Sequence, residues 1–445
     1  MKELQSIPLA PGALPLFGHA LSAMRDPWRF LSGLPDHGDL VRVRLGPSEA
    51  VVVCTPELTH RVMVDDKTFD KVGPLYERSK EILGTTVVSA SHDLHRPLRR
   101  QAQPSFHRNK MPEYARTMTD RIDAVTASWQ DNQVLDVWPE MRGLSAAIAV
   151  DALFGNAISP PDIDRFIEAT SIVNEGVYGQ TMMPPAWRKL PTPANRRYRT
   201  ALAEIHRIAC GMATSCRSED RTGFLPTLLD PAKSPVDIGN EIITYLVAAY
   251  DTGASTLAWA LHLLTEHPRI EERLHEEVDA TLAGAPASFD HLPQLELTER
   301  VIMETLRIQP IAWIFTRCVT TDTELGGHWL PAGTAVVVSP WIIHHRPDVY
   351  EDPARFDPDR WAPDRKRSAR DGTMIAFGGG SRKCIGELFG KIESTLALAT
   401  IVSRWQLRTL PGSSVRRTIA TVNHPKGLHM RAAARTNHSV ALPDY

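Results

Sequence analysis

The sequence predicts a mainly α-helical protein with a small β portion, folded as one unit over its 445 residues. Most segments after residue 57 show helical periodicity, and two short stretches alternate like β-hairpins. One apolar helical pattern, over 236–266, is roughly 45 Å long at 1.5 Å per residue. Because its middle carries few charges, we expect it to be the buried central helix. No repeat or linker divides the chain, so we expect a single domain over 1–445 with a Pro-rich arm over about 1–24.

The predicted elements follow one another without long gaps. Residues 40–54 alternate and then run apolar around Gly46-Pro47, as a hairpin does, and 325–339 predict a second hairpin around 331–333. Four prolines over 177–196 predict a loop, which is either an ordinary connector or a mobile cover over a pocket. Residues 346–365 are predicted to be irregular. Helices are predicted over 111–129, 161–176, 236–266, 296–308 and about 385–405.

The composition excludes several classes of protein. With 42% hydrophobic residues, 23% charged residues and a net charge of −2, the chain is neither disordered nor basic enough to bind nucleic acid generally. Five cysteines without a CxxC pair argue against a disulfide framework or a structural zinc site and suit a reducing cytosol. No stretch approaches the ~18 apolar residues of a membrane span. We therefore expect a cytoplasmic protein with no nucleic-acid partner and no membrane anchor.

The segment FGGGSRKCIG, residues 377–386, carries the strongest chemical signal. Cys384 follows a run of small residues, has Arg382 and Lys383 beside it and precedes a predicted helix. Cationic neighbours and a helix N-terminus both favour thiolate over thiol. Such a thiolate is a nucleophile or a metal ligand, although no base is evident nearby and a buried structural cysteine is the plainer alternative. The glycines do not follow the order of a phosphate-binding loop.

Three other patterns are ambiguous when taken alone. Glu304 and Arg307 face each other at i, i+3 on a helix, which is usually a surface ion pair. Asp251 and Thr252 lie in the middle of the central helix, where an acid is costly unless it is paired or functional and where a threonine hydroxyl can bond back to a carbonyl one turn earlier. Asp65, Asp66 and Asp70 are best read as a solvated acidic helix end.

The combination is more specific, because Phe377, Gly380, Arg382, Cys384 and Gly386 match FxxGxRxCxG position by position. Here the sequence resembles the cytochrome P450 family, whose motif supplies a thiolate ligand to haem. The resemblance implies the cytochrome P450 fold, with a long central helix over a buried heme b (iron protoporphyrin IX), and Cys384 as the iron ligand.

The same resemblance assigns roles to residues elsewhere in the chain. Glu304, Arg307 and Arg360, the last within FDPDRW, correspond to a structural cluster that braces the cysteine loop. Asp251 and Thr252 correspond to the acid–alcohol pair that delivers protons to oxygen, with Ala249 where glycine is common. The residues expected to bind the cofactor are His95, Arg99, Arg317, Phe377, Arg382, Cys384 and Gly386.

The predicted substrate pocket is mostly apolar, which suits a hydrocarbon-like substrate. Several segments resemble bacterial P450s that oxidise cyclic terpenes, such as pentalenene oxygenases. The expected reaction is therefore insertion of one oxygen atom from O2, by hydroxylation or multistep oxidation of a cyclic terpene. The alternatives are a fatty acid or polyketide hydroxylase and, from another class, a haem-binding sensor or carrier without O2 activation. The pocket residues expected from the resemblance are Leu75, Ile82, Leu83, Val87, Met182, Met183, Trp187, Tyr245, Ala248, Ala249, Trp313 and Ile314.

The electrons for this reaction are expected from outside the chain. The sequence has no flavin module, no GxGxxG after a strand and no ferredoxin-type cysteine run. A ferredoxin and its reductase are the expected partners of a monomeric enzyme. A basic face near Arg382, Lys383 and Lys391 is expected to suit an acidic ferredoxin.

Overall fold

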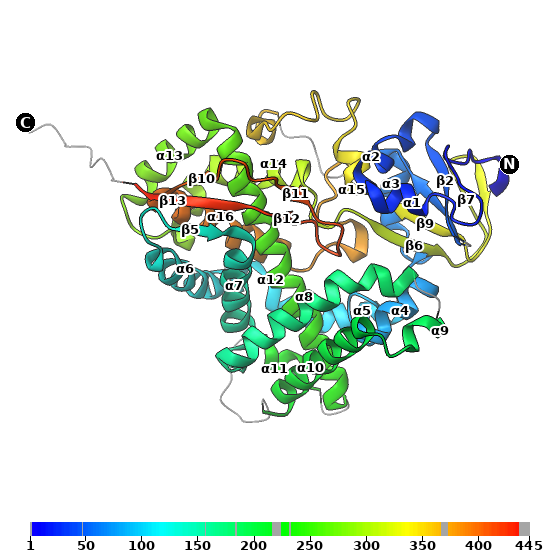
Figure 1. Cartoon of the computed structure of the whole chain (residues 1–445), viewed down its shortest axis with the longest axis horizontal. Coiled ribbons are helices and arrows are strands. Elements are labelled where there is room, and N and C mark those ends of the chain that lie inside the picture. Colours follow the sequence, from blue (N-terminus) through cyan, green and yellow to red (C-terminus); the bar gives the residue numbers. More distant parts are fainter. Residues whose placement is uncertain are drawn as a thin grey trace, which may run out of the picture.

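Helices dominate the computed structural model, and the strands form small sheets in separate parts of the molecule (Figure 1). The predicted fold class, mainly α with a small β portion, is confirmed. The structure describes residues 2–46, 48–155, 157–182, 185–215, 224–230, 233–365 and 373–435. The α-helices are α1 (Ala20–Arg25), α2 (Pro27–Ser32), α3 (Pro56–Val64), α4 (Pro74–Leu83), α5 (His92–Ala102), α6 (Met111–Ser128), α7 (Val137–Ala149), α8 (Pro160–Met182), α9 (Pro185–Lys189), α10 (Pro193–Ser215), α11 (Leu225–Leu228), α12 (Pro235–Glu266), α13 (Pro268–Leu282), α14 (Glu296–Ile308), α15 (Pro340–His344) and α16 (Glu387–Arg404).

The central helix predicted over 236–266 is α12, which runs through the middle of the molecule (Figure 1). Its start is defined by Ser234, whose hydroxyl accepts from the Asp237 N–H, while the Asp237 carboxylate accepts from the Ser234 N–H. Pro235 occupies the first helical position, where no N–H is needed. This reciprocal cap and the apolar sequence that follows explain why the helix starts here and stays buried.

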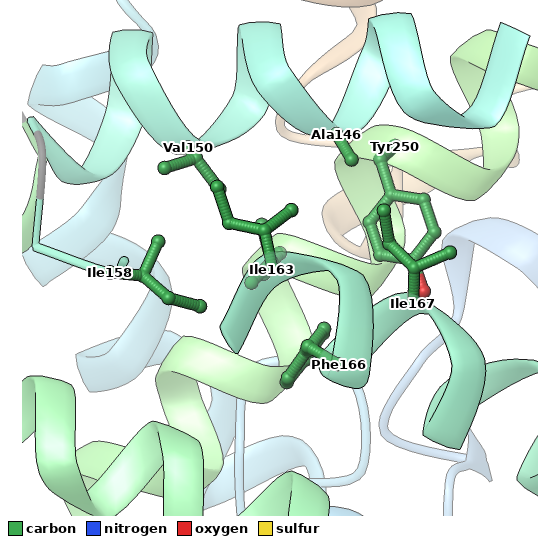
Figure 2. A pocket seen from close by; sticks show the side chains of 8 residues that line it. Ala146, Val150, Ile158, Ile163, Phe166, Ile167 and Tyr250 are labelled. Carbon is green, nitrogen blue, oxygen red and sulfur yellow. The ribbon is translucent and has the colours of Figure 1, made fainter. Parts of the chain in front are cut away.

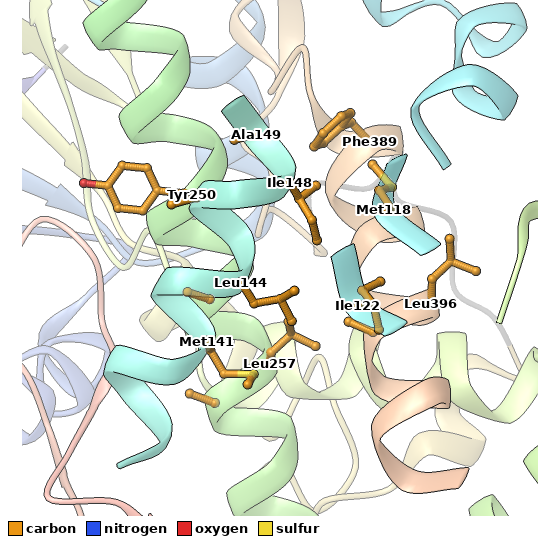
Figure 3. Close-up of a cluster of buried hydrophobic side chains, with 14 of the residues drawn as sticks. Met118, Ile122, Met141, Leu144, Ile148, Ala149, Tyr250, Leu257, Phe389 and Leu396 are labelled. Atoms are coloured by element: carbon orange, nitrogen blue, oxygen red, sulfur yellow. The ribbon is translucent and has the colours of Figure 1, made fainter. Parts of the chain in front are cut away.

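The main hydrophobic core lies where α6, α7, α12 and α16 meet (Figure 3). Side chains from all four helices point toward one another, among them Met118, Leu144, Leu257 and Leu396. Burial of such side chains stabilises the fold by about 1.5–3 kcal/mol each. A second cluster of buried side chains fills the space beneath the strands.

The strands form several small sheets, the largest in the order β2-β3-β9-β6-β4. The predicted hairpin over 40–54 is confirmed, because β2 and β3 pair antiparallel. The predicted hairpin over 325–339 is wrong: β8 pairs with β7 across Gly326-Gly327, and β9 joins β3 and β6 instead. Both glycines have positive φ, as a tight two-residue turn requires. The strands are β1 (Lys2–Glu3), β2 (Leu40–Leu45), β3 (Ser48–Val53), β4 (Phe69–Asp70), β5 (Val134–Asp136), β6 (Phe315–Val319), β7 (Thr323–Leu325), β8 (His328–Leu330), β9 (Ala335–Val338), β10 (Trp405–Thr409), β11 (Arg416–Arg417), β12 (Pro425–Lys426) and β13 (His429–Ala434).

The proline-rich stretch 177–196 is the clearest departure from the predicted elements. It was expected to be a loop, yet α8 continues to Met182 and two new helices start at Pro185 and Pro193. Proline breaks a helix interior but fits its first turn, where its N–H would have no partner. The prolines therefore divide helices here rather than prevent them.

Among the described residues, the structure contains no helix that combines the length and hydrophobicity needed to span a lipid bilayer.

Candidate functional site

Cys384 lies at the end of a tight loop that leads into α16. Its N–H donates to the Phe377 carbonyl at 2.8 Å, which closes the loop. Gly378 and Gly380 have positive φ, and a Cβ on Gly380 would lie 2.2 Å from the Met63 carbonyl oxygen. Glycine is therefore required at position 380 by both conformation and space. The loop holds Cys384 in one place, with Gly386 as the N-cap of α16.

Protein atoms surround Cys384 on most sides, yet part of the residue is accessible to solvent. Its thiol therefore faces a space within the fold. Burial raises the pKa of this thiol, whereas the Gly386 N–H, Arg99 and Lys383 lower it by a smaller amount. The helix terminus and the cations therefore do not by themselves produce a thiolate. A bound metal cation deprotonates a coordinating thiol outright, so the site is suited to a ligand rather than to a free nucleophile.

A stripe of α12 also faces open space, although the helix is otherwise buried. Ala248 and Thr252, one turn apart, are exposed, while Leu246, Tyr250 and Ala254 are buried. Small side chains on this face let a flat or large group approach the backbone closely. The accessible faces of Cys384 and of α12 both lie inside the protein, as an internal cofactor requires.

Basic side chains from distant segments gather near the cysteine loop. Arg99 donates to the Lys383 carbonyl at 2.7 Å, beside Cys384. His95 and Arg317 are buried, and within the described part of the chain the His95 Nδ1 and Arg317 Nε atoms have no hydrogen-bond partner. Burial, Arg382, Lys71 and Arg99 lower the pKa of His95 to about 3.

The charged side chains gathered near the cysteine loop, here called the basic cluster, include more basic than acidic groups. Burial and then the neighbouring Arg317, Arg382 and Arg99 hold the pKa of Lys71 well below its ordinary value. In the described residues the cluster contains one lysine and three arginines but two aspartates, so its basic groups outnumber its acidic groups. The carboxylates of a bound ligand would supply negative charge here and would favour the charged form of Lys71. Lys71 was not identified in the sequence, since a single lysine after a short strand carries no pattern.

The two aspartates of this cluster correct an interpretation of the sequence. Asp66 and Asp70 were expected to belong to a solvated acidic helix end, but they are 5% and 4% exposed. Arg382 pairs with Asp66 at 3.3 Å and with Asp70 at 2.8 Å, and it also donates to the Ala90 carbonyl. Arg382 is thus held rigidly in the cluster by partners more than 290 residues away in sequence.

Asp251 and Thr252 are adjacent in sequence but make separate contacts. The Asp251 carboxylate accepts from Arg142 on α7 at 3.0 Å and from Asn174 on α8 at 2.6 Å. Burial raises the pKa of Asp251, and Arg142 and Asn174 oppose that shift. The Thr252 hydroxyl donates to the Ala248 carbonyl at 2.8 Å. The structure therefore does not bring the two side chains into contact, and transfer of a proton between them needs a rotation or an intervening water.

A small apolar pocket lies on the other side of α12 (Figure 2). Tyr250 and Leu246 precede Thr252 and Ala248 by two positions, which is about 200° around the helix. The Tyr250 hydroxyl contacts Thr170 and Arg142, on the side where Asp251 is bound. This pocket is therefore separate from the space that Cys384 faces. It is lined by Ala146, Val150, Ile158, Ile163, Phe166, Ile167, Leu246 and Tyr250.

Glu304, Arg307 and Arg360 are brought together in a buried cluster. Arg307 forms a bidentate pair with Glu304 at 2.7 and 2.8 Å, and both side chains are 0% exposed. Arg360 contacts the same carboxylate at 3.3 Å, and the Trp361 indole donates to it at 3.0 Å. The remaining N–H groups of Arg307 donate to backbone carbonyls, so every donor of this guanidinium is used.

This cluster connects to the segment that leads into the cysteine loop. Arg307 donates to the His344 carbonyl, and the His344 ring in turn accepts from the Ile375 N–H at 3.1 Å. The Gly378 N–H then donates to the Ile375 carbonyl. A continuous set of hydrogen bonds thus runs from Glu304 to the start of the loop.

The residues expected to line the substrate pocket divide into three groups. Ala248 is exposed on the open face of α12, Ala249 beside it is partly buried, and Ile82, Leu83, Val87 and Ile314 are buried or partly buried. Tyr245 packs against Phe106 and Phe224, Trp313 packs against Trp28, and the Trp187 side chain is 62% exposed. In this structure the Tyr245 ring belongs to the main hydrophobic core and the Trp313 ring to the second cluster, while the Trp187 ring lies at the surface. Met183 lies outside the described residues, as do the side chains of Leu75 and Met182.

A groove of about 620 Å³ lies beside the cysteine loop, between α3, α14 and the start of α16. The prediction of a basic face there is wrong, because Arg382 is buried and paired, and Lys383 and Lys391 both pair with Glu387. Glu296, Glu299 and Arg300 also line the groove. Its charges are close to balanced.

One buried acid near Thr252 was not identified in the sequence. The Glu393 carboxyl on α16 is 1% exposed and interacts with Ser145. A Cβ on Gly253 would lie 2.8 Å from its Oε1 atom. Burial raises the pKa of Glu393 from 4.5 to about 8, so the folded protein keeps a proton that the unfolded chain has released.

Stability is therefore expected to fall as pH rises from about 5 to about 8, because the unfolded state binds fewer protons there. Glu393→Gln, which is neutral at every pH, is expected to remove that slope and to gain about 2–4 kcal/mol relative to the wild type between pH 5 and pH 8. Urea unfolding at several pH values measures this difference. Glu113→Gln on the surface of α6 is the control, and an equal slope in wild type and Glu393→Gln would contradict the assignment.

Comparison with known proteins gives a consistent result over nearly the whole chain. The family model described as Cytochrome P450 matches residues 8–431. Pentalenene oxygenase of Streptomyces avermitilis is 42% identical over 96% of this chain and 97% of its own length. Cyclooctat-9-en-7-ol 5-monooxygenase of Streptomyces melanosporofaciens is 41% identical over 91% of this chain and 90% of its own. The crystal structure of the cytochrome P450DA heme domain superposes with a TM-score of 0.86 at 22% identity, covering 97% of this chain and 98% of that one.

Proposed function

Because this chain belongs to the cytochrome P450 family and is a haem-dependent monooxygenase, we propose that it oxidises a cyclic terpene. The observation that carries the substrate class is the 40–42% identity to three curated relatives, two of whose names specify pentalenene and cyclooctat-9-en-7-ol as substrates. The apolar residues predicted around the open face of α12 agree with such a substrate. We further propose hydroxylation or a multistep oxidation of the terpene skeleton.

The residues present fit the cofactor of the family. Cys384 supplies a thiol that faces a space within the fold, and the basic groups of the cluster outnumber its acidic groups, which suits the two haem carboxylates. Cys384 would hold the iron, and His95, Arg99, Arg317, Arg382 and Lys71 would face the carboxylates. When bound, haem supplies the activation of O2, and a cysteine thiolate ligand favours cleavage of the O–O bond.

The chain itself must supply protons to that reaction, and we assign this role to Thr252 and Asp251. The Thr252 hydroxyl is on the open face of α12, so it would be available as a proton donor at this face after it leaves the Ala248 carbonyl. Asp251 is the adjacent acid, and it reaches this face only when its contacts with Arg142 and Asn174 break or when water connects the two. Those two contacts therefore control the supply of protons.

Thr252→Ala is expected to lower the product formed per NADPH consumed by about 100-fold, the lower end of the range typical for loss of an acid–base group. The physical reason is that O2 reduction continues while the proton needed for productive O–O cleavage arrives too slowly. Product and NADPH are measured together, and Thr252→Ser, which keeps the hydroxyl, is the control. Equal coupling in Thr252→Ala and wild type would contradict the role.

The electron donor is proposed to be a ferredoxin with its reductase, and the charged surface that suits it lies on α5 and the turns after it. Phe106 contacts Gly386, so these turns flank the cysteine loop. Exposed basic residues there and on the first turns of α6 would attract an acidic partner: Arg96, Arg100, Arg108 and Arg116. A cytoplasmic location, favoured by the unpaired state of the four described cysteines, is part of the same proposal.

The proposal is tested by turnover of the holoenzyme with NADPH, a ferredoxin and ferredoxin reductase. A panel of cyclic terpenes, terpene alcohols and fatty acids is first titrated for the spectral change that displacement of water from the iron produces, and products are then identified by mass spectrometry. We expect oxidation of at least one cyclic terpene. Oxidation of fatty acids alone would overturn the substrate class, and absence of O2 consumption with every compound would favour a sensor or carrier.

A further inference from the structure

The segment between α4 and α5, residues 84–90, is held in one conformation without regular secondary structure. The Ser89 hydroxyl donates to the Gly84 carbonyl at 2.6 Å and accepts from the Thr86 N–H at 3.0 Å. The Ala90 N–H donates to the Thr86 carbonyl at 2.8 Å. Thr86, Ser89 and Ala90 are fully buried. Part of this 84–90 loop is therefore fixed in the interior, and the loop contains the buried Val87, which is predicted to line the substrate pocket.

One side of the loop is bound to α12. The Thr244 hydroxyl is hydrogen-bonded to the Thr86 hydroxyl at 3.0 Å and to the Asn240 carbonyl of its own helix at 2.9 Å, and the side chains of Thr244 and Thr86 are buried. One turn earlier, Asn240 packs so closely on Gly84 that a Cβ there would lie 2.2 Å from the Asn240 amide nitrogen. Gly84 ends α4 with a φ of +62°, so glycine is required at this point by conformation and by contact.

The contact with α12 is on the face that leads to the open stripe. Residues 240, 244, 248 and 252 are spaced by four, so they lie along one side of the helix. Thr244 and Thr252 are separated by about 12 Å at 1.5 Å per residue. Ala248, one turn after Thr244, is the first exposed residue of the open stripe, so the loop is bound to α12 about 6 Å from that stripe along the helix axis.

The other side of the loop is bound to the basic cluster. Lys71 donates to the Val88 carbonyl at 2.9 Å, and Arg382 donates to the Ala90 carbonyl at 2.8 Å. Both cations belong to the basic cluster. The loop thus spans the distance from the central helix to the expected carboxylate site of the cofactor.

We propose that Thr244 is a positioning residue that, through Thr86, fixes the 84–90 loop and with it the wall of the substrate pocket at Val87. The proposal rests on the proposed function for its substrate, but not for the geometry that it tests. Thr244 is polar, buried and hydrogen-bonded to a side chain of the loop, whereas the pocket residues expected from the sequence are mostly apolar and are expected to contact the substrate directly. Its effect is therefore on the selectivity of the site and not on the chemistry.

The test compares the holoenzymes of Thr244→Val, which loses the hydroxyl but keeps the shape, and Thr244→Ser, which keeps the hydroxyl. Hydrogen–deuterium exchange of the peptide covering 84–90 is expected to be about fivefold faster in Thr244→Val, because a buried hydrogen bond is lost. Thr244→Ser is expected to match the wild type. Thr86→Val removes the same bond from the loop side and is expected to have the same effect, so one poorly folded variant does not decide the result.

The pocket is probed with imidazole and with the larger 1-phenylimidazole, whose binding to the ferric haem is followed by absorbance. The ratio of the two dissociation constants is expected to rise about fivefold in Thr244→Val, since only the larger ligand reaches the wall. Unchanged exchange or an unchanged ratio in both valine variants would overturn the proposal. Failure of every terpene to react would overturn the proposed function. The exchange rates and the ratio of dissociation constants would still decide the role of Thr244, because neither measurement uses a terpene.

Discussion

Replacing Cys384 by serine is expected to remove the red-shifted Soret band of the ferrous–carbon monoxide complex and to reduce product formation to the level of a reaction without enzyme. The reason is chemical, because a serine hydroxyl does not provide the electron-rich sulfur ligand that favours O–O cleavage. The cysteine loop is held by the bond from the residue 384 N–H to the Phe377 carbonyl, and this backbone bond does not need the sulfur. The variant should therefore fold with its loop in place and lose the ligand alone.

Two measurements separate this result from simple unfolding. Far-ultraviolet circular dichroism and the urea midpoint report the fold, and the absorption spectrum after addition of carbon monoxide reports the ligand. Cys210→Ser, on the partly exposed side of α10, is the matched control and should keep both the spectrum and the activity. Retention of the red-shifted band in Cys384→Ser would mean that another side chain holds the iron, and the assignment of Cys384 would fail.

Cys384 was predictable because all the residues that define its site are contiguous. A ten-residue pattern contains the glycines that turn the loop, the cysteine and the start of the next helix, so local sequence is sufficient. The same is true of Glu304 and Arg307, which are neighbours on one helix turn. The contact with Arg360 was expected from the family resemblance and not from spacing, and the complete burial of the pair was not predicted.

The residues that local sequence could not show are those whose partners are far away along the chain. Asp251 is paired with Arg142 and Asn174 from two other helices, and Arg382 is paired with Asp66 and Asp70. An isolated acid gives no sign of which cation it will meet, because only the packing of the helices decides that. For the same reason, three exposed-looking aspartates were interpreted as a solvated helix end when two of them are buried.

The errors in the fold have a different physical origin. Pro185 and Pro193 were taken as signs of a loop, although proline at the first position of a helix costs nothing. In the segment 325–339, the turn at 331–333 exists, but pairing of the flanking strands is decided by the neighbouring sheets. Both cases show that a local signal marks where the chain changes direction and does not identify what it pairs with.

Glu304→Gln is expected to destabilise the protein by about 3–5 kcal/mol, which is the cost of leaving a buried charge without its partner. Arg307 is completely buried, and its guanidinium has Glu304 as its bidentate counter-ion. The neutral amide retains the size of the side chain but not its charge, so the loss is electrostatic. Urea unfolding measures the change in the free energy of unfolding. We also expect that most of the purified variant protein lacks haem.

Arg360→Gln is the matched control, because Arg360 contacts the same carboxylate from a more exposed position at 3.3 Å. Its loss should cost only about 1–2 kcal/mol, because the side chain makes a long contact with Glu304 and one short hydrogen bond to the Asp352 carbonyl, both near the surface. A Glu304→Gln variant as stable as Arg360→Gln would show that the buried pair does not carry the stability assigned to it.

The double variant Glu304→Leu/Arg307→Met distinguishes stability from positioning. Replacing both members of a buried ion pair by apolar side chains often restores stability, so the urea midpoint is expected to recover in part. Haem binding is not expected to recover with it, because the carbonyls of His344, Pro353 and Arg355 lose the guanidinium that gathers them. His344 then no longer fixes the Ile375 N–H, and the segment entering the cysteine loop is released. Recovery of both properties together would show that the cluster acts only through stability and does not position Cys384.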